Sequence, residues 1–156
     1  MSTQTSLTGN SDYHYFILLY FTDSGVSQIG AELSESVISF TDSSSTVVET
    51  LSYNSKSGFN DIEVDGAVVG QVGYDTAVII DVSYSASAGK KRVGINGNIV
   101  LEKNWTGVDL SGDMFLGHRN NTLADMVVGD LVLYDKSLSP EKRLDVVNSL
   151  LTRRGM

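Results

Sequence analysis

The stretch Arg92-Val-Gly-Ile-Asn-Gly-Asn-Ile-Val-Leu101 decides the fold class, because two short apolar segments in it are joined by Asn96-Gly97. An Asn-Gly pair between such segments is the strongest short-range signal for a two-residue β-hairpin, since both central residues need positive φ. The sequence therefore predicts antiparallel strands over 92–95 and 98–101.

The segments around this hairpin carry β-strand signals as well. Residues 76–84 alternate, with Val78, Ile80, Val82 and Tyr84 on one face and Asp81 and Ser83 on the other. Residues 15–21 are apolar on both faces, which predicts a central strand. Asp65-Gly66 predicts a second hairpin. Further short strands are expected over 37–40, 47–53, 62–64, 67–69, 114–116 and 127–134.

Only the C-terminal end of the chain has a helical pattern, and the predicted helix covers 139–154. Ser139 is a suitable N-cap and Pro140 suits the first helical position. An apolar stripe follows at helical spacing, formed by Leu144, Val147, Leu150 and Leu151. The prediction is an all-β fold, an antiparallel jelly-roll β-sandwich with a short C-terminal α-helix. A single domain is expected over 13–156, preceded by a polar, flexible arm over 1–12.

Composition excludes several classes of function. The 156 residues include eleven Lys and Arg against nineteen Asp and Glu, which gives a net charge of -8. Such a chain is poorly suited to neutralise phosphates, so neither nucleic acid nor an anionic membrane surface is an expected partner. The absence of Cys excludes thiolate metal sites and a cysteine nucleophile. The polar start has no basic n-region, which predicts synthesis in a cytoplasm.

The clearest enzymatic pattern is Glu63-Val64-Asp65, because glycoside hydrolysis needs two carboxylates that flank the scissile bond. The following positions, 66–69, are Gly, Ala, Val and Val, so a second Glu at the expected spacing is missing. Asp65-Gly66 is better explained as a hairpin turn. The chain is therefore predicted not to be an enzyme, with no catalytic residues.

The candidate ligand-binding residues are Trp105 and the polar loop residues His118, Arg119, Asn120 and Asn121. Trp105 has two interpretations, a sugar-stacking platform or a plug at the end of the hairpin. Oxygen-bearing side chains are plentiful on the loops but do not form an EF-hand pattern, so the metal ligands are unknown and Ca²⁺ remains open as a cofactor. These residues are Asp109, Asp113, Asn120, Asn121, Asp125 and Asp130.

The second half of the chain contains several motifs in a familiar order. The 92–100 hairpin is followed by Phe115-Leu116-Gly117, by Gly129-Asp-Leu-Val-Leu-Tyr134, and by Asp135-Lys-Ser-Leu-Ser-Pro-Glu141. This order resembles laminin-G-like and concanavalin A-like jelly-roll domains. Residues 142–156 resemble the closing helix of such domains in phage virion proteins. The resemblance covers residues 76–156.

This resemblance implies a non-catalytic virion protein, either a capsid decoration protein or a tail or fibre accessory protein that binds a repeated protein surface. The expected partners are viral structural proteins and host glycans. The expected assembly is a symmetric homo-oligomer, because virion surfaces present symmetric sites. The alternative is a lectin-like carbohydrate-binding module, with or without calcium dependence.

Overall fold

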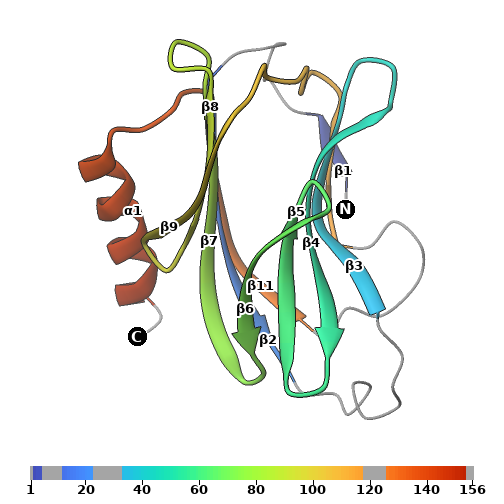
Figure 1. The fold of residues 1–156 in the computed structure, drawn as a ribbon, viewed down its shortest axis with the longest axis vertical. Coiled ribbons are helices and arrows are strands. Elements are labelled where there is room, and N and C mark those ends of the chain that lie inside the picture. Colours follow the sequence, from blue (N-terminus) through green and yellow to red (C-terminus); the bar gives the residue numbers. More distant parts are fainter. Residues whose placement is uncertain (1, 5–11, 23–32, 118–125, 154–156) are drawn as a thin grey trace. The chain divides into compact units, whose positions relative to one another are not determined.

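The computed structural model describes residues 2–4, 12–22, 33–117 and 126–153 (Figure 1). The chain forms two compact units, each assembled from three separate segments around one β-sheet. The first unit comprises residues 1–10, 21–76 and 108–127, and the second comprises 11–20, 77–107 and 128–156. Each unit therefore takes its segments from the N-terminal, middle and C-terminal parts of the chain. The single domain over 13–156 stays a prediction.

The first unit contains a sheet with the strand order β1-β10-β3-β4-β5-β6. These strands are β1 (Ser2–Gln4), β3 (Leu33–Thr41), β4 (Val47–Lys56), β5 (Phe59–Val64), β6 (Ala67–Gly73) and β10 (Asp113–Leu116). The apolar side chains that it buries include Ile38, Phe40, Leu51, Tyr53, Ile62 and Val64. Most of these strands are longer than predicted, because polar residues extend the ladders past the apolar segments.

The predicted turn at Asp65-Gly66 is confirmed. Asp65 has φ 51° and Gly66 has φ 74°, as a two-residue hairpin between β5 and β6 requires. The backbone N–H of Asp65 donates to the Thr50 carbonyl at 3.0 Å, and the Thr50 N–H donates to Asp65 Oδ1 at 3.3 Å. Asp65 is thus held by the neighbouring strand β4 as a turn residue.

The second unit contains a sheet with the strand order β11-β2-β7-β8-β9. Its strands are β2 (Tyr13–Phe21), β7 (Thr76–Ser85), β8 (Lys90–Ile95), β9 (Asn98–Asn104) and β11 (Met126–Tyr134). The apolar strand β2 lies between β11 and β7, which confirms its predicted central position. Asn96 and Gly97 have φ 49° and 85°, so the turn between β8 and β9 is also confirmed.

The C-terminal helix α1 (Pro140–Arg153) lies beside this second sheet (Figure 1). The predicted cap is confirmed, because the Lys142 N–H donates to Ser139 Oγ at 3.4 Å. Val147 and Leu150 of α1 pack with side chains of the sheet, which are Phe16, Leu18 and Ile79. The predicted apolar stripe is wrong at Leu144, which is 43% exposed, whereas Arg143 is buried.

The predicted N-terminal arm has two described segments. Residues 2–4 form β1, which pairs antiparallel with β10, and Thr3 is opposite Met114. In the second unit, the Ala86 N–H donates to Asp12 Oδ1 at 2.7 Å. The flexibility of the arm stays a prediction. No helix in the described ranges is long and apolar enough to cross a membrane.

Candidate functional site

A pocket of about 350 Å³ lies in the second unit, where α1 begins beside the β8–β9 hairpin. This volume is at the lower end of the range typical of small-molecule sites, about 300–1,000 Å³. The strands β2, β7, β8 and β9 contribute one wall, and α1 with its preceding segment contributes the other. The lining side chains are His14, Ser83, Arg92, Ile99, Glu102, Leu138, Pro140 and Arg143.

Strand register explains why the polar residues converge. Ser83 of β7 is opposite Arg92 of β8, and Arg92 is opposite Glu102 of β9, so these three side chains form one row across the sheet. The β8–β9 ladder is irregular at Val93 and Gly94, which pair with Leu101 and Ile99 and leave one extra residue on β9. Such a bulge changes which side chains share a face. It allows Ile99 and Glu102, three positions apart, to line the same pocket.

A buried ion pair supports the pocket from below. Asp81 of β7 is fully buried, and Arg143 of α1 binds both of its carboxylate oxygens, through Nε at 2.7 Å and Nη2 at 2.7 Å. Arg143 Nη1 also donates to the Gly97 carbonyl at 2.9 Å. Burial raises the pKa of Asp81, but the hydrogen bonds from His14 and Arg143 together outweigh this effect, so the pKa of Asp81 lies below its ordinary value. Asp81 is therefore an ionised structural partner for Arg143.

Gly94 makes room for this ion pair. It is opposite Asp81 in the β7–β8 ladder, and a Cβ at this position would collide with both the guanidinium of Arg143 and the carboxylate of Asp81. A side chain here would therefore push α1 away from the sheet. The glycine serves close packing, since its φ is not in the left-handed region.

His14 is buried at the base of the pocket, with 1% of its surface exposed. Its Nε2 is 3.3 Å from Asp81 Oδ2, and its ring stacks on Phe16 with centroids 4.3 Å apart. Nδ1 has no hydrogen-bond partner in the part of the chain that the structure describes. The Asp81 carboxylate favours a proton on Nε2, which makes Nδ1 an acceptor in the neutral ring.

Arg92 and Glu102 form the exposed rim of the pocket. Arg92 Nε donates to Glu102 Oε2 at 2.6 Å, and Lys90 Nζ is 3.8 Å from Glu102 Oε1. The hydrogen bond from Arg92 lowers the pKa of Glu102, so this carboxylate is ionised at neutral pH. Ser83 of β7, which lies opposite Arg92 in the ladder, lines the same pocket.

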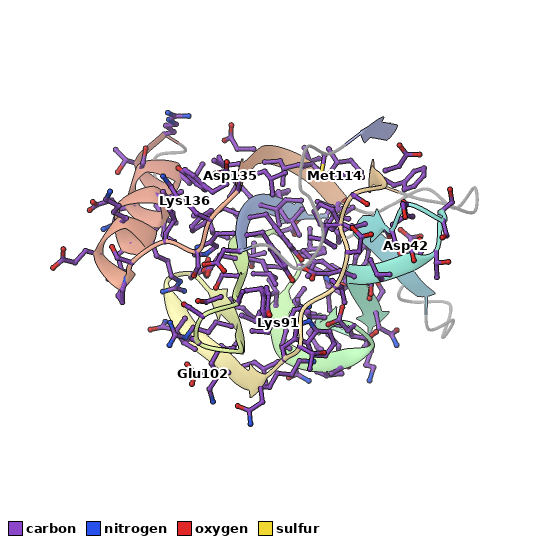
Figure 2. The ribbon with its side chains drawn as sticks, turned by 90° about the horizontal axis from the view of Figure 1, so that it is seen from above. Asp42, Lys91, Glu102, Met114, Asp135 and Lys136 are labelled. Atoms are coloured by element: carbon purple, nitrogen blue, oxygen red, sulfur yellow. The ribbon has the colours of Figure 1, made fainter. Side chains whose placement is uncertain are left out.

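Trp105, the predicted aromatic candidate, follows β9 directly and is half-buried. The ammonium groups of Lys91 and Lys103 lie over its ring, 4.9 Å and 4.4 Å from the centroid. Figure 2 shows Lys91 among packed side chains and Glu102 at the periphery. Trp105 is not among the residues that line the pocket, and its role as a sugar platform stays a prediction.

The other predicted ligand residues, His118, Arg119, Asn120 and Asn121, lie outside the described residues, as does Asp125. Asp109 accepts a hydrogen bond from the Ser111 N–H at 2.9 Å, as expected of a turn residue. Over the described ranges, no group of three or more His, Asp or Glu side chains is arranged to hold a metal ion. Calcium binding therefore stays a prediction.

The residues of the pocket and of the ion pair beneath it are not predicted from the sequence, although the two members of the ion pair carry a signal. Asp81 is a charge inside an otherwise apolar strand, and Arg143 stands four residues before Val147 and seven before Leu150. One charged residue within an apolar strand and another on the apolar side of a helix indicate a buried ion pair, because burial of an unpaired charge costs too much free energy. Ser83, Arg92 and Glu102 carry no comparable signal, because their alignment depends on strand register.

The fold is shared with several solved structures. The binding domain of Paraclostridial Mosquitocidal Protein 1 matches with a TM-score of 0.66 at 12% identity, over 96% of this chain and 41% of that one. A heptameric SAP-like pentraxin from Limulus polyphemus matches with a TM-score of 0.67 at 11% identity, over 94% and 74%. No protein-family model matches the chain, and no curated protein matches its sequence.

A third match is a botulinum neurotoxin type C structure, described by the dependence of cell entry on two ganglioside molecules. Its TM-score is 0.57 at 13% identity, over 92% of this chain and 36% of that one. The chain thus spans about two fifths of the two toxin structures. These similarities define the class of fold, an all-β, two-sheet antiparallel sandwich with one C-terminal helix, which resembles the fold of the pentraxin. The predicted fold class is confirmed.

Proposed function

We propose that this chain is a non-catalytic binding module whose ligand is a carbohydrate. The observation that carries the proposal is the pocket beside α1, whose lining combines polar side chains such as Ser83, Arg92 and Glu102 with the apolar side chains Ile99, Leu138 and Pro140. Sugars present hydroxyl groups on their edges and C–H groups on their faces, so they suit a pocket of this mixed character. One of the similar structures, that of botulinum neurotoxin type C, is described by its interaction with ganglioside molecules, which carry sugars, and this supports the same class of ligand.

The state of the carboxyl groups supports a non-catalytic role. A glycosidase needs a general acid with a raised pKa beside a second carboxylate. The pKa of Asp61 is lowered by its hydrogen bonds to Lys56 and Gln71, and the pKa values of Asp81 and Glu102 are lowered as well. The cross-strand neighbours of Glu63 are Ser52 and Val68, so the ladder provides it with no second carboxylate.

A glycan array probed with the purified full chain tests the proposal. Binding to a defined set of glycans is expected. If the chain binds none of the glycans on the array, the proposed function is overturned. Repeating the array with a chelator tests calcium dependence, because loss of binding would show that a metal ion takes part in it.

The virion assignment remains a separate proposal, since none of these similarities bears on it. The surface that the sequence suggests for a repeated protein partner is the Ser- and Thr-rich stretch 34–53. Ser39 and Ser52 within it are buried. Co-sedimentation with assembled capsids and with isolated tails tests it. Recovery with either particle is expected, and recovery with neither would contradict it.

A further inference from the structure

The rim of the pocket beside α1 holds more positive than negative charge. Glu102 contacts two cations at once, Arg92 through Nε at 2.6 Å and Lys90 through Nζ at 3.8 Å. Beneath the rim, Arg143 and Asp81 form a closed pair of opposite charges. These contacts bring three Lys and Arg side chains together with two carboxylates. The pocket therefore has a local surplus of positive charge, although the whole chain has a net charge of -8.

The guanidinium group of Arg92 can bind an anion and keep its contact with Glu102. A guanidinium is a planar fork with five N–H donors, and the contact with Glu102 uses the Nε donor. The two terminal nitrogens form a second edge of the fork, whose donors match the paired oxygens of a carboxylate or sulfate group. The side chain of Arg92 is 44% exposed, so a ligand can reach this edge from solvent.

Lys90 adds a second positive charge on the same side of the sheet. It stands two positions before Arg92 in β8, and side chains two positions apart in a strand leave the sheet on the same face. The two Cα atoms are about 6.6 Å apart at the usual strand rise, which is within the Debye length of about 8 Å at physiological ionic strength. An anion bound by Arg92 is therefore also attracted by Lys90.

The remaining lining of the pocket suits a sugar ring. Ser83 lies opposite Arg92 in the β7–β8 ladder and lines the pocket, and its hydroxyl can donate or accept a hydrogen bond. Ile99, 47% exposed, offers an apolar surface at the rim, and Leu138 and Pro140 continue it. The volume of about 350 Å³ is near the lower end for small-molecule sites, so it suits one ring better than a chain of rings.

We propose that this pocket binds an acidic sugar, a ring that carries a carboxylate or a sulfate group. The inference rests on the proposed carbohydrate-binding function and names the class of its ligand. The terminal nitrogens of Arg92 bind the acidic group, and Lys90 strengthens its attraction. Ser83 bonds to a hydroxyl of the ring, and Ile99 contacts its C–H face. Glu102 orients Arg92, but its own charge opposes the ligand.

Titration calorimetry of the full chain with matched glycosides tests the charge preference. Methyl glucoside, methyl glucuronide and methyl glucoside 6-sulfate differ only at C6, as do the corresponding galactose compounds, and the array shows which ring to use. At least one of the two acidic glycosides is expected to bind about tenfold more tightly than the neutral one, the equivalent of one charge-assisted hydrogen bond. Equal or tighter binding of the neutral glycoside would overturn the inference.

Two further measurements separate a sugar site from simple attraction of anions. Added salt should weaken binding of the acidic glycoside more than that of the neutral one, because it screens the exposed charges. Sodium acetate and sodium sulfate, titrated alone, should bind at least about tenfold more weakly than the acidic glycoside. If either free anion binds as tightly, the ring contributes nothing and the inference is wrong.

Variants that lose affinity locate the site. Arg92→Gln is expected to weaken binding of the acidic glycoside by about tenfold, because it removes the charge and the fork of donors. Lys90→Gln should weaken it less, since Lys90 acts at longer range. Arg153→Gln, the same change at an exposed position of α1, is the matched control and should leave binding unchanged. Circular dichroism confirms that each variant is folded.

A variant that gains affinity excludes misfolding as the explanation. Glu102→Gln keeps the length of the side chain and a hydrogen-bond acceptor for Arg92, but removes the opposing charge. It should tighten binding of the acidic glycoside by about threefold, as expected for one like charge removed at roughly 7 Å in water. Asp135→Asn removes a carboxylate at an exposed position away from Glu102 (Figure 2) and should leave the affinity unchanged. Equal gains in both variants would contradict a local role of Glu102.

The outcomes distinguish this inference from the proposed function. If no glycan binds on the array, both fail. If glycans bind but the acidic ones have no advantage, the inference fails and the proposed function stands. The same holds if Arg92→Gln binds the acidic glycoside as tightly as Arg153→Gln does, because the site then lies elsewhere.

Discussion

Replacement of Arg143 by Met tests the buried ion pair most directly. The substitution keeps an unbranched side chain of similar length but removes both hydrogen bonds to Asp81 and the one to the Gly97 carbonyl. Asp81, which is fully buried, would keep only its contact with His14 at 3.3 Å. Removal of one partner from a buried pair typically costs about 3–5 kcal/mol, because the remaining charge is uncompensated.

The assay is urea unfolding at pH 7, followed by far-ultraviolet circular dichroism and by the fluorescence of Trp105, the single tryptophan. Arg153→Met, an exposed substitution on the same helix, is the control and should cost less than about 1 kcal/mol. If Arg143→Met destabilises the protein no more than this control does, the ion pair does not hold α1 on the sheet.

A double-mutant cycle with Asp81→Asn separates the pair from general damage to the helix. In the Asp81→Asn background, Arg143→Met leaves no buried charge behind. It should therefore lower the free energy of unfolding by less than it does in the wild-type background. A coupling free energy of about 1–3 kcal/mol is expected for directly bonded groups. A coupling below about 0.5 kcal/mol would mean that Arg143 acts through packing alone.

The pH dependence of this effect has a defined sign. The pKa of Asp81 is lowered in the folded protein from its ordinary value of 3.8, so the pair stabilises the protein fully above that value. The contribution is lost as the pH falls through the lower, folded pKa. The difference between wild type and Arg143→Met should therefore shrink below pH 3.8, and a constant difference down to pH 2 would contradict the argument.

Three further substitutions have expected outcomes in thermal or urea unfolding. Gly94→Ala should destabilise the protein by about 1–3 kcal/mol through overpacking against the buried ion pair, and a neutral result would show that α1 can shift at no cost. Gly107 has φ 79°, and a Cβ at this position would lie 2.9 Å from the Tyr84 ring, so Gly107→Ala should lower the free energy of unfolding by at least about 1 kcal/mol. Gly58 has φ 88° but open space around it, so Gly58→Ala is the control that measures the backbone cost alone. Asn96→Ala should lower the free energy of unfolding by about 1–2 kcal/mol, because it removes the 2.8 Å hydrogen bond from the Ile79 N–H and places alanine at φ 49°. Asn96→Gly also lacks the hydrogen bond but adopts this φ without strain, so it should be less destabilising than Asn96→Ala.

Much of the fold could be predicted because its signals are local. Asn96-Gly97 and Asp65-Gly66 specify their turns, because these residue types tolerate the positive φ that the turns require. Ser139 caps the helix by accepting a hydrogen bond from the N–H of Lys142, three residues further along the chain. The strand extensions were less predictable. Residues 54–56 continue β4 although they are polar, because the ladder with β5 supplies their hydrogen bonds.

The candidate site shows the limit of the sequence more clearly. Trp105 and residues 118–121 are candidates because of the chemistry of each side chain by itself, whereas the pocket is built from residues that give no such signal one by one. Ser83, Arg92 and Glu102 come together because three strands pair in one register, with one extra residue on β9 that sets which side chains face α1.

The all-β class, the two-residue hairpins and the C-terminal helix can thus be predicted, since each depends on residues close together in the chain. The contact between Asp81 and Arg143, which are 62 residues apart and pack against Gly94, and the pocket beside them become visible only once the chain is folded. Local sequence preferences determine backbone angles, so they act between neighbouring residues. A charged side chain, by contrast, can be buried only where tertiary packing places an oppositely charged partner next to it.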